Sequence, residues 1–248
     1  MDNKNQKIAL LIDGDNAQSK MIDVILEEAS KYGKVTIRRI YGDWTTPHMN
    51  RWKGILNEMA FTPIQKFSYT TGKNSTDSAL IIDAMDILHA KLVDGFCIAS
   101  SDSDYTGLAK RIRESGIFVM GIGEKKTPEA FVKSCEIFTY VENLVQKPEI
   151  SETPSKPAKT ATKKTTGTEK EKPSLSLKLI NKAYDMSINE SNEAYISTLG
   201  INLRKMDPSF DVRTYGCKTL TQFFSKLPGF DIVDNVVNGL NNPLIKKK

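Results

Sequence analysis

The chain is poor in the residues on which several enzyme classes depend. Its 248 residues include three cysteines, two histidines and two tryptophans. Cys97, Cys135 and Cys217 are an odd set without the Cys-x-x-Cys spacing, so a disulfide framework or a cysteine-based zinc site is not expected and the thiols are predicted to be reduced. With only His48 and His89, histidine-based catalysis has little support.

Several sequence signals are also missing. No apolar run reaches the length of a membrane span, and the polar start MDNKNQK does not resemble a signal peptide, so a cytoplasmic protein is expected. The phosphate-binding pattern GxxxxGK[ST] is absent. Residues 121–123, Gly-Ile-Gly, lack the third glycine of a dinucleotide fingerprint and follow a late strand. P-loop and dinucleotide-dependent enzymes are therefore disfavoured.

A change in composition divides the chain. Residues 147–174 hold no aromatic residue and one large aliphatic residue, Ile150, which predicts a disordered linker between domains at 1–146 and 175–248. The net charge of +5 divides into −1, +3 and +3 over these three segments. The basic linker and C-terminal segment favour a polyanionic partner, although lysines that only keep the protein soluble would give the same balance.

The first domain alternates short apolar runs with helical periodicity, which predicts an α/β fold with a doubly wound, mostly parallel sheet. The second segment predicts three helices and a small hairpin, the composition of a winged helix-turn-helix. Strands are expected near residues 8–12, 35–40, 61–67, 95–100, 117–122 and 136–141, and helices near 21–30, 48–58, 77–89 and 105–115. In the second segment, helices are expected near 175–184, 194–203 and 218–227, with a hairpin of 230–233 and 243–245.

Four aspartates stand where strands end or helices begin: Asp13, Asp77, Asp102 and Asp104. Parallel strands end at one edge of an open sheet, where ligands bind, so the four carboxylates are expected to gather there. Such a cluster needs a bound cation or raised pKa values, and carboxylate oxygens favour Mg²⁺ or Mn²⁺. Each acid alone also fits a turn or a helix cap, and the coincidence of three such junctions favours function.

Two neighbouring acids are left out of the predicted site. Asp15 points out of phase with Asp13 if the chain there is extended. Asp83 lies six residues after Asp77, roughly 600° around a helix, and is predicted to be structural.

Three motifs in order, IALLIDGDNAQ, GKNSTDSALIIDAMDIL and ASSDSDYTGLAKRIRESGIFVMGIG, resemble the NYN domain, a branch of the PIN-like nucleases, over nearly all of residues 7–145. The resemblance implies a Rossmann-like domain that cuts RNA with a divalent metal. The catalytic and metal-binding residues it implies are Asp13, Asp77, Asp102 and Asp104. Candidate RNA contacts in this domain are Asn16, Lys73 and Ser101. Both Ser100 and Ser101 could donate hydrogen bonds to phosphate or could instead orient the carboxylates.

The segment from Leu175, with YGCKTLTQFFSKLPGFDIV, resembles the OST-HTH or LOTUS domain, a winged helix linked to RNA binding. That family also includes members that dock onto proteins, so single-stranded or structured RNA and a protein partner both stay open. Arg213, Lys218 and the terminal lysines 246–248 are the candidate RNA contacts, with plain solvated charge as the alternative. The oligomeric state is not determined by these patterns.

The leading hypothesis is a metal-dependent ribonuclease with a tethered RNA-binding domain. The main alternative is a non-catalytic adaptor that binds RNA or protein with the same fold. A third reading is a phosphatase, because Asp13-Gly14-Asp15 resembles the start of aspartate-nucleophile phosphatases. Turnover of a phosphate ester that depends on Asp15 would identify it.

Overall fold

The structure is a computed structural model that describes residues 6–67, 75–145, 177–237 and 240–248. These residues form two compact units, which we describe separately. The linker predicted at 147–174 lies outside the described residues, so the domain boundaries stay predictions.

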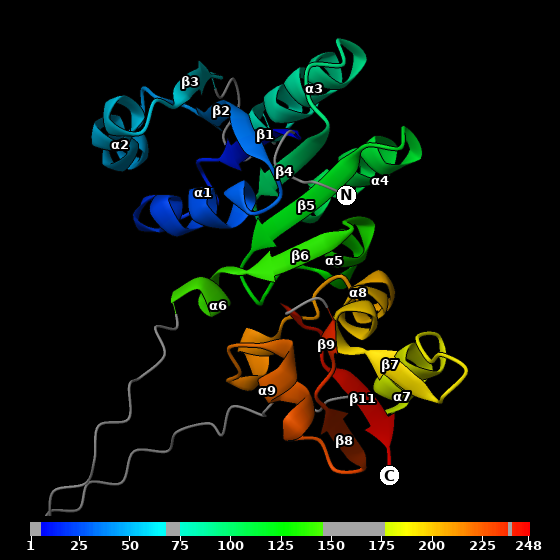
Figure 1. Cartoon of the computed structure of the whole chain (residues 1–248). Helices are drawn as coiled ribbons and strands as arrows, with labels where there is room; N and C mark the ends of the chain where they lie inside the picture. The colour runs from blue at the N-terminus through cyan, green and yellow to red at the C-terminus, as the bar shows by residue number, and fades with distance from the viewer. Residues whose placement is uncertain (1–5, 68–74, 146–176, 238–239) are drawn as a thin grey trace, which may run out of the picture. The chain divides into compact units, whose positions relative to one another are not determined.

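The first unit is built on a six-stranded sheet in which every neighbouring pair of strands is parallel (Figure 1). The strand order is β3-β2-β1-β4-β5-β6, the order of a doubly wound sheet whose direction of winding reverses beside β1. The predicted α/β fold is thus confirmed, and all six predicted strands are present. They are β1 (Lys7–Asp13), β2 (Lys34–Gly42), β3 (Thr62–Gln65), β4 (Gly95–Ala99), β5 (Phe118–Gly123) and β6 (Ile137–Tyr140).

Strand β1 lies at the centre of the sheet and is covered on both faces. Ala9 and Leu11 belong to the hydrophobic cluster on one face, and Ile8, Leu10 and Ile12 belong to the cluster on the other. Alternate residues of a strand point to opposite faces, so a strand that is buried on both sides must be apolar throughout. This explains why the sequence there is an unbroken apolar run that ends in a charged residue.

Helices cover each face of the sheet. The cluster that holds Ala9 is completed by α3, α4 and α5, and the cluster that holds Ile8 by α1, α2 and α6. The helices are α1 (Ile22–Ser30), α2 (Lys53–Glu58), α3 (Ser75–His89), α4 (Thr106–Glu114), α5 (Glu129–Ser134) and α6 (Val141–Val145). Short 3-10 turns, Ser19–Met21, Pro47–Trp52 and Ser103–Tyr105, precede α1, α2 and α4.

The second unit holds three helices and a three-stranded antiparallel sheet of order β7-β11-β8. The predicted hairpin is confirmed, with Val233 opposite Leu244 and Ile232 opposite Ile245. Ala194 was predicted to lie in the second helix and lies instead in β7, where it pairs with Ile245. The elements are α7 (Leu177–Asp185), β7 (Glu193–Tyr195), α8 (Ile196–Met206), α9 (Leu220–Ser225), β8 (Phe230–Val233), β9 (Val236–Val237), β10 (Leu240–Asn241) and β11 (Leu244–Lys247).

The three cysteines are buried, unbonded thiols, as predicted. Burial raises the pKa of the Cys135 thiol to about 12, so it stays protonated and unreactive. None of the helices in the described ranges combines the length and the apolar character that crossing a membrane requires.

Candidate active site

The sheet brings distant parts of the chain to one edge. Strands β1 and β4 are parallel neighbours, with Ile12 opposite Ala99, so the residues that follow each strand lie at the same end. Asp13 is the last residue of β1, and the turn of residues 100–105 follows β4. Helix α3 supplies Asp77 from its first turn. Helix α3 contacts both β1 and the 3-10 turn Ser103–Tyr105, so the three junctions meet at this edge.

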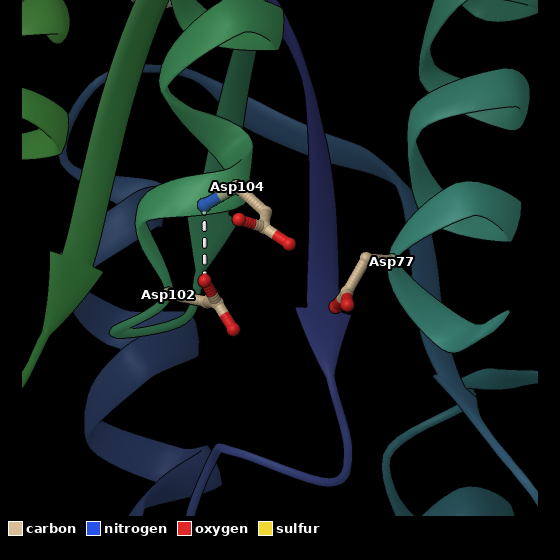
Figure 2. A group of neighbouring side chains, drawn as sticks. All are labelled: Asp77, Asp102 and Asp104. Carbon is tan, nitrogen blue, oxygen red and sulfur yellow. Dashed lines mark hydrogen bonds between the residues drawn. The ribbon is translucent and has the colours of Figure 1, made fainter. Parts of the chain in front are cut away.

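Asp77, Asp102 and Asp104 form a group of carboxylates, each with an oxygen atom within 4.8 Å of the others. Asp77 projects from α3 toward Asp102 and Asp104, which precede α4 (Figure 2). Asp102 caps its 3-10 turn, because its Oδ1 accepts a hydrogen bond of 2.9 Å from the backbone N–H of Asp104. The capping role and the gathering of acids, which the sequence could not separate, occur together.

Asp13, the last residue of β1, is fully buried. Its Oδ2 accepts hydrogen bonds from Asn16 Nδ2 at 2.7 Å, from Ser100 Oγ at 3.0 Å and from the Tyr105 hydroxyl at 3.2 Å. Its Oδ1 accepts from the backbone N–H groups of Asp15 and Asn16. Asp13 is not one of the three acids whose oxygens meet within 4.8 Å, so its predicted role as a metal ligand stays a prediction.

Tyr105 links the two buried acids. Its hydroxyl donates to Asp77 Oδ1 at 2.7 Å and lies within hydrogen-bond distance of Asp13. Burial, followed by the negative charge of Asp13, raises the pKa of Tyr105, so the hydroxyl remains a donor. From the sequence, Tyr105 was predicted only to begin a helix, so this role was not predicted.

The two acids nearest this hydroxyl, Asp13 and Asp77, have surroundings that disfavour the ionised carboxylate. Burial raises the pKa of Asp13 despite the hydrogen bonds from Asn16 and Ser100. Burial also raises the pKa of Asp77, and the neighbouring charges of Asp13, Asp102 and Asp104 add to the shift. A cation at this edge would relieve both effects, because it favours the ionised carboxylates.

The turn after β1 is fixed from two sides. The Thr76 hydroxyl donates to Asp15 Oδ2 at 2.8 Å, which ties this turn to the first turn of α3. Gly14 donates its N–H to the carbonyl oxygen of Tyr41 at 2.8 Å, and a Cβ atom at position 14 would lie 2.7 Å from the same oxygen. Asp15, left out of the predicted site, thus helps to position the helix that carries Asp77.

Asp83 has a structural role, in agreement with its prediction. Its carboxylate accepts hydrogen bonds from Arg39 and from the Tyr41 hydroxyl, both on β2. Tyr41 is fully buried, and burial followed by the bond to Asp83 raises the pKa of its hydroxyl. Asp83 therefore connects α3 to β2 and is not one of the three clustered acids.

The predicted RNA contacts of the first unit have different surroundings. The side chain of Asn16 is engaged with Asp13. Ser101 accepts a hydrogen bond of 2.9 Å at Oγ from the backbone N–H of Glu124, at the end of β5. Ser100, rather than Ser101, orients the acids, since its Oγ donates to Asp13 and accepts from the backbone N–H of Asp102. Lys73 lies outside the described residues.

In the second unit, the side chains of the two predicted RNA contacts, Arg213 and Lys218, differ in accessibility. Arg213 is held by Asp211, with its Nε 2.8 Å from Oδ2 and its Nη2 2.6 Å from the same oxygen. Lys218 is exposed, and its backbone N–H donates to Gln222 Oε1 at 2.7 Å. Of the two side chains, Lys218 is the more accessible to a phosphate group.

Comparisons with known proteins give two family matches in order along the chain. Residues 7–142 match the NYN domain and residues 174–240 match the OST-HTH/LOTUS domain. A search of curated proteins found no match. Among solved structures, a protein of unknown function from Vibrio parahaemolyticus RIMD 2210633 is 21% identical, with a TM-score of 0.47 over 56% of this chain and 94% of its own. MurG from Acinetobacter baumannii is 11% identical, with a TM-score of 0.37 over 54% of this chain and 41% of its own.

Proposed function

Because the chain belongs to the NYN-domain family and carries an OST-HTH/LOTUS domain after it, we propose that it is a divalent-metal-dependent ribonuclease that hydrolyses phosphodiester bonds of RNA. The NYN domain is a branch of the PIN-like nucleases and the OST-HTH/LOTUS domain is an RNA-binding domain, so the two matches support a nuclease with an RNA-binding domain. Beyond these domain assignments, we propose a divalent metal ion as the cofactor, the clustered aspartates as its ligands and phosphodiester hydrolysis as the reaction. The group of Asp77, Asp102 and Asp104 is the observation that carries it.

The chemistry of these donors fits Mg²⁺ or Mn²⁺. Both ions prefer oxygen ligands, and Mg²⁺ holds its ligands at about 2.0–2.1 Å, which places oxygens that share one ion roughly 3–4 Å apart. The oxygens of the three acids lie within 4.8 Å of one another, close to this spacing. Asp104 is exposed and Asp102 partly exposed, which leaves them accessible to an ion and to RNA.

A divalent cation, when bound, lowers the pKa of a water molecule and offsets the charge that grows on the phosphate during hydrolysis. The protein's own residues keep the acids in place for this task. Ser100 and Asn16 hold Asp13, and Tyr105 holds Asp77 beside it. We propose that Asp13 contributes a fourth negative charge to the site, either as a ligand or from behind the three clustered acids. No side chain is required as a nucleophile.

The second domain would hold the RNA that the first domain cuts. Lys218 is the side chain proposed to contact phosphate, and the terminal lysines 246–248 add to the positive charge of the same domain. Lys247 and Lys248 are paired with Asp185 and Asp231, so their charge is partly compensated. Modest positive charge of this kind supports sequence-independent RNA binding.

An assay with labelled single-stranded RNA tests the proposal. The full chain should cleave the RNA in Mn²⁺ or Mg²⁺ and lose this activity in EDTA, and Asp102→Asn should lower the rate at least about 100-fold because it removes a charged ligand. Asp86→Asn is a matched control, since Asp86 is an exposed acid on α3 and is not one of the clustered acids. Intact RNA with both metals, together with RNA binding, would identify the chain as a non-catalytic adaptor instead.

A further inference from the structure

Strand β2 is longer than its neighbour β3, so part of its outer edge is uncovered. Strand β3 lies opposite Arg39–Gly42, whereas β2 begins at Lys34. Within the described ranges, Lys34–Arg38 therefore have β1 on one side and no strand on the other. A strand that lacks a neighbour presents the main-chain N–H and C=O groups of alternate residues at that edge. We call Lys34–Arg38 the free edge of β2.

A groove that is open to solvent follows this free edge. Residues 34–39 line it, together with Ala60 and Thr62, which lie just before and at the start of β3. Its volume is about 590 Å³. Five residues of extended chain, the length of the free edge, span roughly 16 Å. Because most of the lining residues are consecutive along one strand, the groove can hold a short extended segment beside β2.

The groove is positively charged. Its ionisable side chains are Lys34, Arg38 and Arg39, and none of the described residues that line it is acidic. Asp83 compensates the charge of Arg39. Arg38 Nη1 donates at 3.0 Å to the carbonyl oxygen of Met59, a neutral partner, and Lys34 is exposed, so both keep their positive charge. Complementary charge therefore favours an anionic occupant.

The main-chain groups of the free edge favour a polypeptide over RNA. The phosphate oxygens of an RNA strand only accept hydrogen bonds, so they would satisfy the N–H groups of β2 but would repel its C=O groups. An extended polypeptide presents both N–H and C=O groups at the spacing of a strand, so it can pair with both kinds of group.

Charge also disfavours two occupants that the chain itself could supply. Residues 147–174 carry a net charge of +3, so they would be repelled from a cationic groove. A second copy could pair its own free edge antiparallel to this one, centred on Thr36. That arrangement would place Lys34 of one copy opposite Arg38 of the other, and like charges directly opposite each other destabilise a pair of strands.

We propose that the free edge of β2 binds an extended acidic segment of a partner protein, which adds to the sheet as a strand in line with β3. The main chain of the segment bonds to β2, and its carboxylates meet Lys34 and Arg38. Lys34 pairs with Lys7 and Tyr41 pairs with Asp13, so the free edge begins at the end of β1 away from Asp13. Binding there requires neither RNA nor metal and is independent of the proposed ribonuclease activity.

Fluorescence anisotropy with labelled peptides tests the proposal on the full chain. The probe is a peptide of about seven residues, slightly longer than the free edge, in which Glu and Val alternate. One counterpart has Lys in place of Glu, and a second is N-methylated at every peptide bond, which keeps the charge but removes the main-chain donors. We expect the acidic peptide to bind at least about tenfold more tightly than either counterpart, and added salt to weaken it.

Two variants and a matched control locate the binding. Lys34→Glu reverses an exposed charge, and Arg38→Gln removes a charge while it keeps an amide that can donate to Met59. Each should weaken binding of the acidic peptide at least about fivefold. Lys110→Glu, at an exposed lysine of α4 that does not line the groove, should bind the peptide as wild type does. Thermal unfolding of the three variants verifies that each is folded.

The other outcomes would overturn the proposal in different ways. Equal binding of the acidic and the N-methylated peptides would mean charge attraction without an added strand. Labelled single-stranded RNA that binds less tightly to Lys34→Glu and Arg38→Gln, without peptide binding, would assign the groove to nucleic acid. Failure of every peptide and of RNA to bind there would show that Lys34 and Arg38 only protect the free edge from pairing.

Discussion

The hydroxyl group of Tyr105 donates a hydrogen bond of 2.7 Å to Oδ1 of Asp77. The same hydroxyl lies 3.2 Å from Oδ2 of Asp13, so one buried tyrosine connects the two acids whose pKa values are raised by burial. Partners of this kind behind a metal site fix the orientation of the ligands and set their basicity.

Removal of this hydroxyl should weaken the site without changing its shape. Tyr105→Phe deletes the donor to Asp77, and we expect Mn²⁺ affinity to fall about 10-fold to 100-fold, the usual effect of losing such a partner. The free energy of unfolding should fall by about 1–3 kcal/mol because buried acceptors are left unsatisfied. Calorimetric Mn²⁺ titration and urea unfolding measure the two effects.

Tyr32→Phe is the control for this substitution. Tyr32 stacks on Phe118 on the other side of the sheet, so Mn²⁺ affinity should be unchanged. A Tyr105→Phe protein that loses stability but binds Mn²⁺ as tightly as wild type would show that the hydroxyl serves folding alone.

The raised pKa values of Asp13 and Asp77 predict how stability depends on pH. From the ordinary value of 3.8 up to each raised pKa, the folded protein holds more protons than the unfolded chain, so the cation-free protein loses stability as pH rises through this window. A divalent cation binds the ionised acids and opposes this loss. The increase in melting temperature caused by Mg²⁺ should therefore grow as pH rises from 3.8 through the raised pKa values of the two acids, because protons stop competing with the cation.

Thermal unfolding with and without Mg²⁺ across this range measures the effect. Asp77→Asn removes one of the two titrating acids, so the growth with pH should shrink and the cation-free protein should be more stable near neutral pH than wild type. A Mg²⁺ effect that is the same at every pH would contradict the assignment of these acids to the cation.

We expect two glycine-to-alanine substitutions, one in the turn after Asp13 and one in α2, to change the free energy of unfolding in opposite directions. A Cβ atom at Gly14 would lie 2.7 Å from the backbone oxygen of Tyr41, so Gly14→Ala should lower the free energy of unfolding by about 1–3 kcal/mol. Gly54 in α2 has no atom within 4 Å of the same position, and Gly54→Ala should raise stability by roughly 0.5–1 kcal/mol. Urea unfolding of both variants decides this, and equal destabilisation would contradict the crowded turn.

The fold was largely predictable because its central strands, β1 and β4, are buried on both faces. A strand such as β1 must be apolar throughout, and that pattern is local in the sequence. The helix α5 was missed because Glu129–Ser134 is less than two turns long, too short for helical periodicity to be recognised. Ala194 was assigned to a helix because its apolar neighbours fit helical spacing, whereas pairing with β11, about 50 residues later in the chain, makes it part of a strand.

The acids of the candidate site were predictable for a similar reason, since each stands at the end of a recognisable element. The contacts that hold these acids in place could not be predicted from the sequence. Tyr105 is 92 residues from Asp13 and 28 from Asp77, and in the sequence it is only another apolar position of a helix. The hydrogen bond from Gln18 to Glu124 likewise joins residues 106 positions apart. Side chains whose roles depend on such distant partners carry no local signal.

We expect the side chains of Lys218 and Arg213 to contribute differently to RNA binding. The Arg213 guanidinium is occupied by Asp211, whose Oδ1 also caps the backbone of Arg213 at 2.8 Å, so a phosphate would have to compete with an internal ion pair. Lys218→Ala should therefore weaken binding of single-stranded RNA of any sequence and reduce the slope of log affinity against log salt by about 0.7. Arg213→Ala should change that slope less and lower stability by roughly 0.5–2 kcal/mol through loss of the pair. Fluorescence anisotropy at several salt concentrations, with urea unfolding of both variants, distinguishes the two residues; a larger salt effect for Arg213 would mean that RNA displaces Asp211 and that the internal pair is a latent phosphate site.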